Sequence, residues 1–489
     1  MRTALLPLLS CLAQCFNFAG AFAQSSTNQT WAYRLVEGSY LVDDCLICER
    51  PTIQWPLRGT FNLALVEENP LFRRFAVRDI NFVTRSDPPY VTTGQGTYQI
   101  GGEVALRQDM VLDVEVNGQR KIFTNDVATV ERREPMIEIH LVQTNQDLIH
   151  FFSLDLVAAP VREIWFSTAH GMTTSNSNKT ITFGDLISFS GRVVKSNADL
   201  VGHLGFMPPV PTLGIDAVDI ASGGEILFSL NDAMFSEKLG QIGGGDVLSD
   251  RGRIVLKSAD LMANFAPKPS LPDYGLDALM VMPDGEILFS ITTNLMSATA
   301  GGITHGDILS YRVVGGAATN RVYKTNQQLL SAFRPANAAP NYGLDALYVW
   351  PSGEIWFSTE TGFNSQIYGP VSDGDLLSDR GKIIFRNLEL VSAFAPVEAL
   401  TNFGLDALFI VTDVTAPVSP PKFLNLALNS QNGNVPLNWD GPGKVFQLEK
   451  APDVVGPYLP ITPIMVETNF TDVGTLTNST KAFYRIRQW

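Results

Sequence analysis

Between residues 36 and 150 the chain alternates apolar with polar positions in short runs, the pattern of β-strands that bury one face. A clear case is the run Val111-Leu-Asp-Val-Glu-Val, which is followed at once by Asn117-Gly118, a strong signal for a tight hairpin turn. Runs of this kind predict strands at 60–65, 75–82, 97–100, 110–116 and 136–142. We therefore expect an N-terminal antiparallel β domain over residues 24–150.

A different pattern recurs through the middle of the chain. The stretch GLDALYVWPSGEIWFS at 343–358 has close copies at 214–229 and 275–290, its first half alone at 404–411 and its second half alone at 162–167. Its aspartate recurs at intervals of 61, 68 and 61 residues, at Asp216, Asp277, Asp345 and Asp406. A second Gly-Asp marker recurs at intervals of 61, 61 and 68 residues, at Asp185, Asp246, Asp307 and Asp375. Two markers that share one period indicate one structural unit repeated four times.

Each unit contains four predicted strands, which in the fourth unit lie at 344–350, 354–358, 374–378 and 382–385. Pro351-Ser-Gly353 turns the first strand into the second, because proline presets the turn and glycine accepts a positive φ. Repeated four-stranded antiparallel units are typical of β-propeller blades, so we expect a four-bladed propeller over 151–411. The first unit lacks a complete first strand. We expect residues 405–411 to supply it by pairing with 163–167, which would remove an open sheet edge.

Two resemblances support the propeller interpretation. The stretch Pro-Ser-Gly-Glu-Ile-Trp-Phe-Ser-Thr-Glu at 351–360 resembles the blade signature of virginiamycin B lyase-type propellers over about ten residues per unit. This likeness implies a blade and does not by itself imply that activity. The number of units and the Asp-Ala strand openings are similar to those of hemopexin-like propellers, in which small four-bladed rings are usual.

The rest of the chain completes an all-β prediction. Residues 412–421 form a proline-rich linker, semi-rigid and extended. Residues 422–489 are a compact series of strand patterns that resembles a fibronectin type III-like β-sandwich, with Trp439 as its core aromatic residue. The ending of the chain also resembles those of uncharacterised secreted bacterial repeat proteins, and this likeness implies no particular activity.

The N-terminus predicts export. Residues 1–23 combine one arginine, an apolar run and the small-residue ending Ala21-Phe-Ala23, the features of a cleaved signal peptide. No later stretch reaches the roughly 18 uninterrupted apolar residues of a spanning helix, so we expect a secreted or periplasmic protein without a membrane span after signal removal. Glycosylation sequons, which matter only in a eukaryotic source, occur at Asn28, Asn178, Asn469 and Asn478.

An oxidising compartment favours a local disulfide between Cys45 and Cys48 that clamps the fold. A redox role would require the Cys-x-x-Cys motif to start a helix in a βαβ pattern, and a zinc site would require further Cys or His ligands nearby. Neither context surrounds the pair. The net charge of -14 argues against nucleic acid as a partner, because phosphates need a clustered basic surface.

The repeated acids are the first candidates for chemistry. If the first strand of each unit is innermost, Asp216, Asp277, Asp345 and Asp406 face the central channel, and a ring of oxygens suits Ca²⁺. The alternative is that each aspartate accepts hydrogen bonds from its own turn. For the second set, which begins at Asp185, turn capping is the leading interpretation.

An active site needs an asymmetric arrangement, which the variable loops between second and third strands could provide. The catalytic candidates there are His170, His305, Asp232 and Glu360. In this hypothesis the two histidines act with Glu360 or Asp232 as base and orienting group. The favoured function is non-catalytic binding of an extracellular protein or glycan by this loop face, or a structural role. The alternative is a polysaccharide-acting lyase or hydrolase with its site in the same loops.

Overall fold

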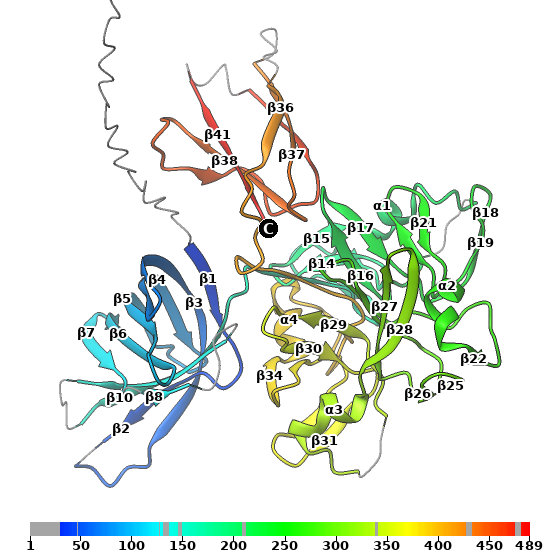
Figure 1. Ribbon diagram of the computed structural model, residues 1–489. Coiled ribbons are helices and arrows are strands. Elements are labelled where there is room, and N and C mark those ends of the chain that lie inside the picture. Colours follow the sequence, from blue (N-terminus) through cyan, green and yellow to red (C-terminus); the bar gives the residue numbers. More distant parts are fainter. Residues whose placement is uncertain are drawn as a thin grey trace, which may run out of the picture.

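The computed structural model describes residues 30–45, 47–126, 128–130, 136–144, 149–207, 212–337, 341–426, 433–474 and 481–489. These residues form an all-β protein in which every strand pairing between sheet neighbours is antiparallel. The predicted signal peptide and the sequons at Asn28 and Asn478 lie outside the described residues. In Figure 1 the N-terminal strands, the green and yellow middle of the chain and the orange and red C-terminal strands form three groups.

The N-terminal strands form one large sheet that closes on itself, because β9 pairs with both β7 and β10. Its strands are β1 (Thr30–Leu35), β2 (Tyr40–Asp44), β3 (Ile53–Glu68), β4 (Phe72–Thr84), β5 (Val91–Gly101), β6 (Arg107–Val116), β7 (Gln119–Thr124), β8 (Ala128–Thr129), β9 (Ile137–Gln143) and β10 (Phe151–Ala159). The alternation read from the sequence buries one face, with Leu112, Val114 and Val116 inside. The predicted turn is present, since Asn117 and Gly118 have φ of 48° and 79° between β6 and β7.

The boundary of this domain lies later than expected. The sequence pattern predicted residues 151–159 as part of the repeat region. In the structure these residues form β10, which pairs with β2 and β9 in the N-terminal sheet. Phe152, Leu154 and Leu156 alternate with more exposed residues and enter the same core as the other N-terminal strands. The boundary is therefore at Pro160, and the N-terminal domain runs past residue 150.

The repeat region forms four four-stranded sheets with one strand order. The first contains β35 (Leu408–Val411), β11 (Glu163–Phe166), β14 (Leu186–Ser188) and β15 (Arg192–Lys195). The second contains β16 (Val218–Ala221), β17 (Glu225–Phe228), β20 (Val247–Ser249) and β21 (Arg253–Leu256). The third contains β23 (Ala278–Val281), β24 (Ile287–Ser290), β27 (Ile308–Val314) and β28 (Ala317–Lys324). The fourth contains β29 (Ala346–Val349), β30 (Ile355–Ser358), β33 (Leu376–Ser378) and β34 (Lys382–Phe385).

These four sheets are arranged in a circle. The strand β35, from the end of the repeat region, pairs with β11 at its beginning, in the pairing that the sequence predicted. The strands that begin each sheet also neighbour one another in a closed cycle, in which β35 lies beside β16, β16 beside β23, β23 beside β29 and β29 beside β35. We call these four the inner strands.

A repeated serine joins each sheet to the next inner strand. The hydroxyl at the end of each second strand donates to the backbone carbonyl of the residue just before a repeated aspartate. The donor–acceptor pairs are Ser167–Ile215 (2.9 Å), Ser229–Leu276 (2.8 Å), Ser290–Leu344 (3.0 Å) and Ser358–Leu405 (2.7 Å). All four serines are fully buried. The last pair closes the circle.

The loops between second and third strands carry short strands that the sequence analysis did not predict. They are β12 (Met172–Thr173) with β13 (Thr180–Ile181), β18 (Met234–Ser236) with β19 (Gly240–Ile242), β25 (Leu295–Ser297) with β26 (Gly301–Ile303), and β31 (Phe363–Ser365) with β32 (Gly369–Val371). A further short strand, β22 (Pro267–Lys268), lies between the second and third sheets in the chain and pairs with β25. Short helices follow the fourth strands, namely α1 (Asn197–Val201), α2 (Ser258–Met262), α3 (Asn326–Leu330) and α4 (Asn387–Leu390), with 3-10 turns at Ala263–Phe265, Ser331–Phe333 and Ser392–Phe394.

The C-terminal strands form two three-stranded sheets. One contains β36 (Lys422–Leu426), β37 (Val435–Asp440) and β40 (Asn469–Asp472), and the other contains β39 (Leu459–Pro460), β38 (Phe446–Ala451) and β41 (Phe483–Gln488). Trp439, predicted as a core aromatic residue, is 1% exposed and packs with Phe446 and Leu448 from the opposite sheet.

The buried carboxylate of Asp413 joins all three groups of strands. Its Oδ2 accepts a hydrogen bond from the backbone N–H of Ala32 in β1 (2.9 Å). Its Oδ1 accepts from Arg162 Nε beside β11 (2.7 Å) and from the indole N–H of the C-terminal Trp489 (2.9 Å). The start of the linker is therefore fixed to its surroundings.

We predict that Ser358→Ala lowers the free energy of unfolding by about 1–3 kcal/mol, because it leaves the buried Leu405 carbonyl without its donor. Urea unfolding followed by circular dichroism measures the effect, with the exposed Ser270→Ala as control. Equal stability of wild type and Ser358→Ala would show that the serine does not hold the circle closed.

Candidate metal centre

The repeated Gly-x-Asp segments place four aspartates at one end of the inner strands. Each aspartate stands one or two residues before its strand, and each inner strand neighbours the next around the circle. The charges of Asp216, Asp277, Asp345 and Asp406 therefore act on one another. This gathering at the axis is the placement that the sequence analysis considered for a metal site.

Three carboxylates converge more closely than the others. Oxygen atoms of Asp277, Asp345 and Glu360 all lie within 4.8 Å of one another. Asp277 and Asp345 come from the predicted ring, whereas Glu360 was predicted as a catalytic candidate. Among the described residues, the cluster that could hold a metal ion consists of these three and does not include Asp216 or Asp406.

Glu360 breaks the fourfold symmetry of the repeat. It stands two residues after the repeated serine of its unit, where the other units carry Ala169, Asn231 and Thr292. Its side chain lies over Gly343, whose φ is +73°, and a Cβ on that glycine would be 2.5 Å from the Glu360 carboxyl carbon. The glycine of the repeat thus leaves the space through which Glu360 reaches the ring.

Burial and mutual repulsion raise the pKa of every ring aspartate. The pKa of Asp216 rises to about 8, because burial removes water from the carboxylate and because Asp406, Asp232 and Glu360 are negative neighbours. Burial, with a contribution from Asp373, raises the pKa of Asp406 to about 7. The same two causes raise the pKa values of Asp277 and Asp345 well above their usual range. The ring is therefore unstable as a set of free anions.

Asp277 provides the buried oxygen that best fits a bound cation. Its side chain is 7% exposed, and its buried Oδ2 has no hydrogen-bond partner among the described residues. The Asp277 carboxyl is also in hydrogen-bond contact with Glu360. Two carboxyl groups can make this contact only if one of them holds a proton or if a cation neutralises the pair.

The donor set fits Ca²⁺. Calcium binds oxygen ligands at about 2.3–2.6 Å, so two ligands of one ion can be at most about 5 Å apart. The Asp277, Asp345 and Glu360 oxygens meet this limit. Magnesium, with ligands at about 2.0–2.1 Å, would require them to lie closer. His305 Nδ1 is 2.7 Å from Glu360 Oε2 and orients that carboxylate from outside the cluster.

The second set of repeated acids caps turns and helices, as the leading interpretation held. Asp185 Oδ2 accepts from the Thr182 N–H (2.8 Å) and Oδ1 accepts from the Asn197 N–H at the start of α1 (2.7 Å). The same pair of backbone contacts occurs in the other three units, at Asp246, Asp307 and Asp375. Their oxygens are thus already occupied by N–H donors.

The four catalytic candidates do not form one group. Among the described residues, the ion pair within this set joins His305 to Glu360. His170 is exposed, its backbone N–H donates to the Phe403 carbonyl (3.0 Å), and its ring acts electrostatically on Asp373. Asp232 is exposed and contributes to the raised pKa of Asp216. Among the described residues, the ion pair of Glu360 is therefore with His305, whereas the charge of His170 acts on Asp373.

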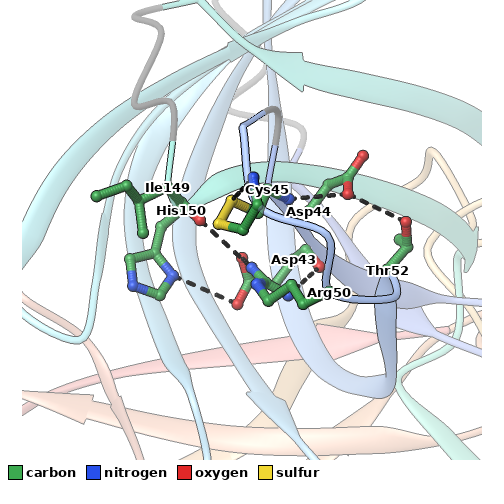
Figure 2. Close-up of a disulfide and its surroundings, with 8 residues drawn as sticks. Asp43, Asp44, Cys45, Arg50, Thr52, Ile149 and His150 are labelled. Carbon is green, nitrogen blue, oxygen red and sulfur yellow. Dashed lines mark hydrogen bonds and ion pairs between the residues drawn. A yellow bond between two sulfur atoms is a disulfide. The ribbon is translucent and has the colours of Figure 1, made fainter.

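The predicted disulfide is present between Cys45 and Cys48. Figure 2 shows it after β2, beside a polar group in which Arg50 contacts Asp43 (2.7 Å) and the Ile149 carbonyl (3.4 Å). Asp44 accepts from the Cys45 N–H (2.8 Å) and from Thr52 (3.1 Å). The disulfide and these contacts hold the turn between β2 and β3, which agrees with a structural clamp.

No protein-family model and no curated protein matches this chain. The described part of the chain contains no helix of the length and apolarity that a membrane crossing requires.

We predict that the ring makes the metal-free protein less stable as the pH rises. Above about pH 4 the unfolded chain releases protons that the folded ring retains. The raised pKa of Asp216 therefore lowers stability between about pH 4 and pH 8, and the raised pKa of Asp406 does so up to about pH 7. Asp216→Asn should therefore raise the thermal midpoint relative to wild type by about 2–5 °C at pH 8.5 and by much less at pH 5.5. Scanning fluorimetry in chelator measures this difference, and an effect of Asp216→Asn that is equal at both pH values would contradict it.

We predict a modest and local effect of the disulfide. It closes a loop of very few residues, so replacement of Cys45 and Cys48 by serine should cost no more than about 2 kcal/mol. Chemical unfolding of the double variant measures this loss. Cation binding should stay unchanged, and a lost cation response would mean that the disulfide affects the distant ring.

Proposed function

We propose that this protein is an exported, non-catalytic binding protein built on a four-bladed β-propeller that holds Ca²⁺ at its axis. The observation that carries the proposal is the convergence of Asp277, Asp345 and Glu360 within 4.8 Å, with a buried Asp277 oxygen that has no hydrogen-bond partner in the described part of the chain. Four sheets of one strand order, closed by the β35–β11 pairing, support the propeller. Two facing three-stranded sheets support a fibronectin type III-like C-terminal module.

A cation at this position would connect neighbouring sheets. Asp277 precedes β23 in the third sheet, whereas Asp345 and Glu360 flank β29 and β30 in the fourth. One ion bound to all three would therefore link these sheets at the same end as the loops that follow the second strands. Those loops differ in sequence between units, as binding loops on a repeated scaffold do. We propose that this stabilised loop face recognises an extracellular protein or glycan.

The competing function is a polysaccharide-acting lyase or hydrolase. It requires a free acid–base pair, but Glu360 is engaged with both His305 and Asp277. The charge of His170 acts on Asp373, and the ion pair of Glu360 is with His305. These contacts favour the binding protein over the enzyme.

Calcium titration of the mature protein tests the proposal. We expect Ca²⁺ to raise the thermal midpoint with the logarithm of the ligand excess, and elemental analysis to find bound calcium. Asp277→Asn and Glu360→Gln should each weaken binding by at least about tenfold, because each removes a charged ligand. The control is Asp260→Asn, an exposed carboxylate in α2.

The absence of bound metal, together with a midpoint that ignores both Ca²⁺ and chelator, would overturn the calcium site. Immobilised polysaccharides and proteins probe the second half of the proposal. Retention that depends on Ca²⁺ and leaves the polysaccharide intact supports the binding protein. New reducing ends in the polysaccharide would instead establish the enzyme.

A further inference from the structure

The end of the inner strands opposite the aspartates opens into a cavity of about 700 Å³. All four inner strands contribute residues to its wall, as do the hairpin turns that follow β16, β23 and β29. The linker and the C-terminal domain supply the remaining wall. We call this cavity the apolar chamber. It is separate from the metal centre, because the aspartates precede the inner strands and the chamber residues lie along and after them.

One position of the repeat determines the character of the chamber. Three residues after each ring aspartate stand Asp219, Met280, Tyr348 and Phe409. The last three line the chamber, where the next residue of each inner strand, such as Ile220 or Ile410, adds a further aliphatic side chain. Trp489 of the C-terminal domain faces the same space. Methionine and aromatic side chains adapt well to flat or irregular apolar molecules.

The charges at the chamber neutralise one another. Lys444, from the turn between β37 and β38, contacts both oxygens of Asp219 at 2.9 and 3.1 Å and lies 5.7 Å from the Phe409 ring centre. The Asp219 carboxylate also accepts from the N–H groups of Ile220 and Val281, each at 2.7 Å. The Tyr348 hydroxyl is engaged by Thr415 of the linker. These polar groups are occupied, so the described residues that line the chamber offer no unpaired charge to an ionic ligand.

Water is a poor occupant of such a space. A buried water needs several polar partners, and the Lys444 and Tyr348 side chains at this chamber already have partners in Asp219 and Thr415. The volume falls within the range of about 300–1,000 Å³ that is usual for small-molecule sites with mostly apolar walls. The chamber is also built where separate domains meet, a common position for such sites.

We propose that the apolar chamber binds an uncharged, largely apolar small molecule between the inner strands and the C-terminal domain. The ligand contacts Met280, Tyr348 and Phe409 on one side and Trp489 on the other. Because its wall includes the linker and the C-terminal domain, a bound ligand stabilises the docked arrangement of that domain. The proposal is independent of the calcium site and of recognition by the loop face.

Titration with Nile red, an uncharged apolar dye, tests the chamber. We expect saturable binding of one dye per chain and a rise in the thermal midpoint at saturation. Ala221→Phe and Ser222→Trp add bulk at the chamber wall and should each weaken dye binding by at least about tenfold. Ser222 is exposed to solvent, so its replacement leaves the protein core unchanged even where Ala221→Phe disturbs folding.

Ser352→Trp is the matched control. It adds the same side chain to an exposed serine in the hairpin turn of the fourth sheet, outside the chamber wall, and should bind the dye as wild type does. Asp277→Asn should also bind the dye normally, which separates this test from that of the metal centre. The proposal is overturned if wild type shows no saturable binding, or if Ser222→Trp binds the dye as tightly as Ser352→Trp.

Discussion

The hydrogen bonds from the repeated serines to the next inner strand are the constraint on which the rest of the structure depends. Each serine is fully buried and donates to the carbonyl that immediately precedes a ring aspartate. Because the acceptor and the aspartate are adjacent in the chain, the bond that joins two sheets also fixes the backbone that presents the carboxylate. Closure by Ser358 and Leu405 makes the positions of the four aspartates mutually dependent. The same hydrogen bonds therefore close the circle of sheets and position the four aspartates.

This arrangement holds like charges together against their repulsion. Burial raises the pKa values of the aspartates, so in the metal-free ring their charges are neutralised by bound protons. A cation can replace those protons without moving the backbone, since the inner strands are fixed by pairing and by the serines. Glu360 would then decide where around the ring a cation binds, because it adds a third carboxylate close to Asp277 and Asp345.

The sequence predicted those parts of the fold that depend on local pattern. Strand alternation, the Asn117-Gly118 turn and the pairing of 405–411 with 163–167 all follow from periodicity and turn chemistry, and the structure contains them. The pattern of β10 also predicts a strand, but only its partners β2 and β9 show to which sheet it belongs. The short hairpins after the second strands, such as β31 with β32, lie in loops whose sequences differ, so no repeat revealed them.

The sequence likewise predicted only the part of the candidate site that depends on the repeat. The spacing of the aspartates placed them at one axis, whereas the role of Glu360 depends on the path of a loop over Gly343. Comparison of equivalent positions could have found it, because Glu360 is the charged residue where other units have Ala169, Asn231 and Thr292. The partners of Asp413 come from β1, from Arg162 and from the last residue of the chain, and no local pattern connects them.

Both sites therefore lie where the repeat departs from its own symmetry. At one end of the inner strands Glu360 adds a negative charge, and at the other end Asp219 replaces the apolar residue of the other units. The first departure supports the proposed cation site, and the second is neutralised by Lys444 from the C-terminal domain. An acid at the apolar end would destabilise the isolated circle of sheets, since a buried carboxylate needs a partner. Asp219 thus ties the integrity of the chamber to the docking of the C-terminal domain, in the way that Glu360 would tie the ring to the proposed cation.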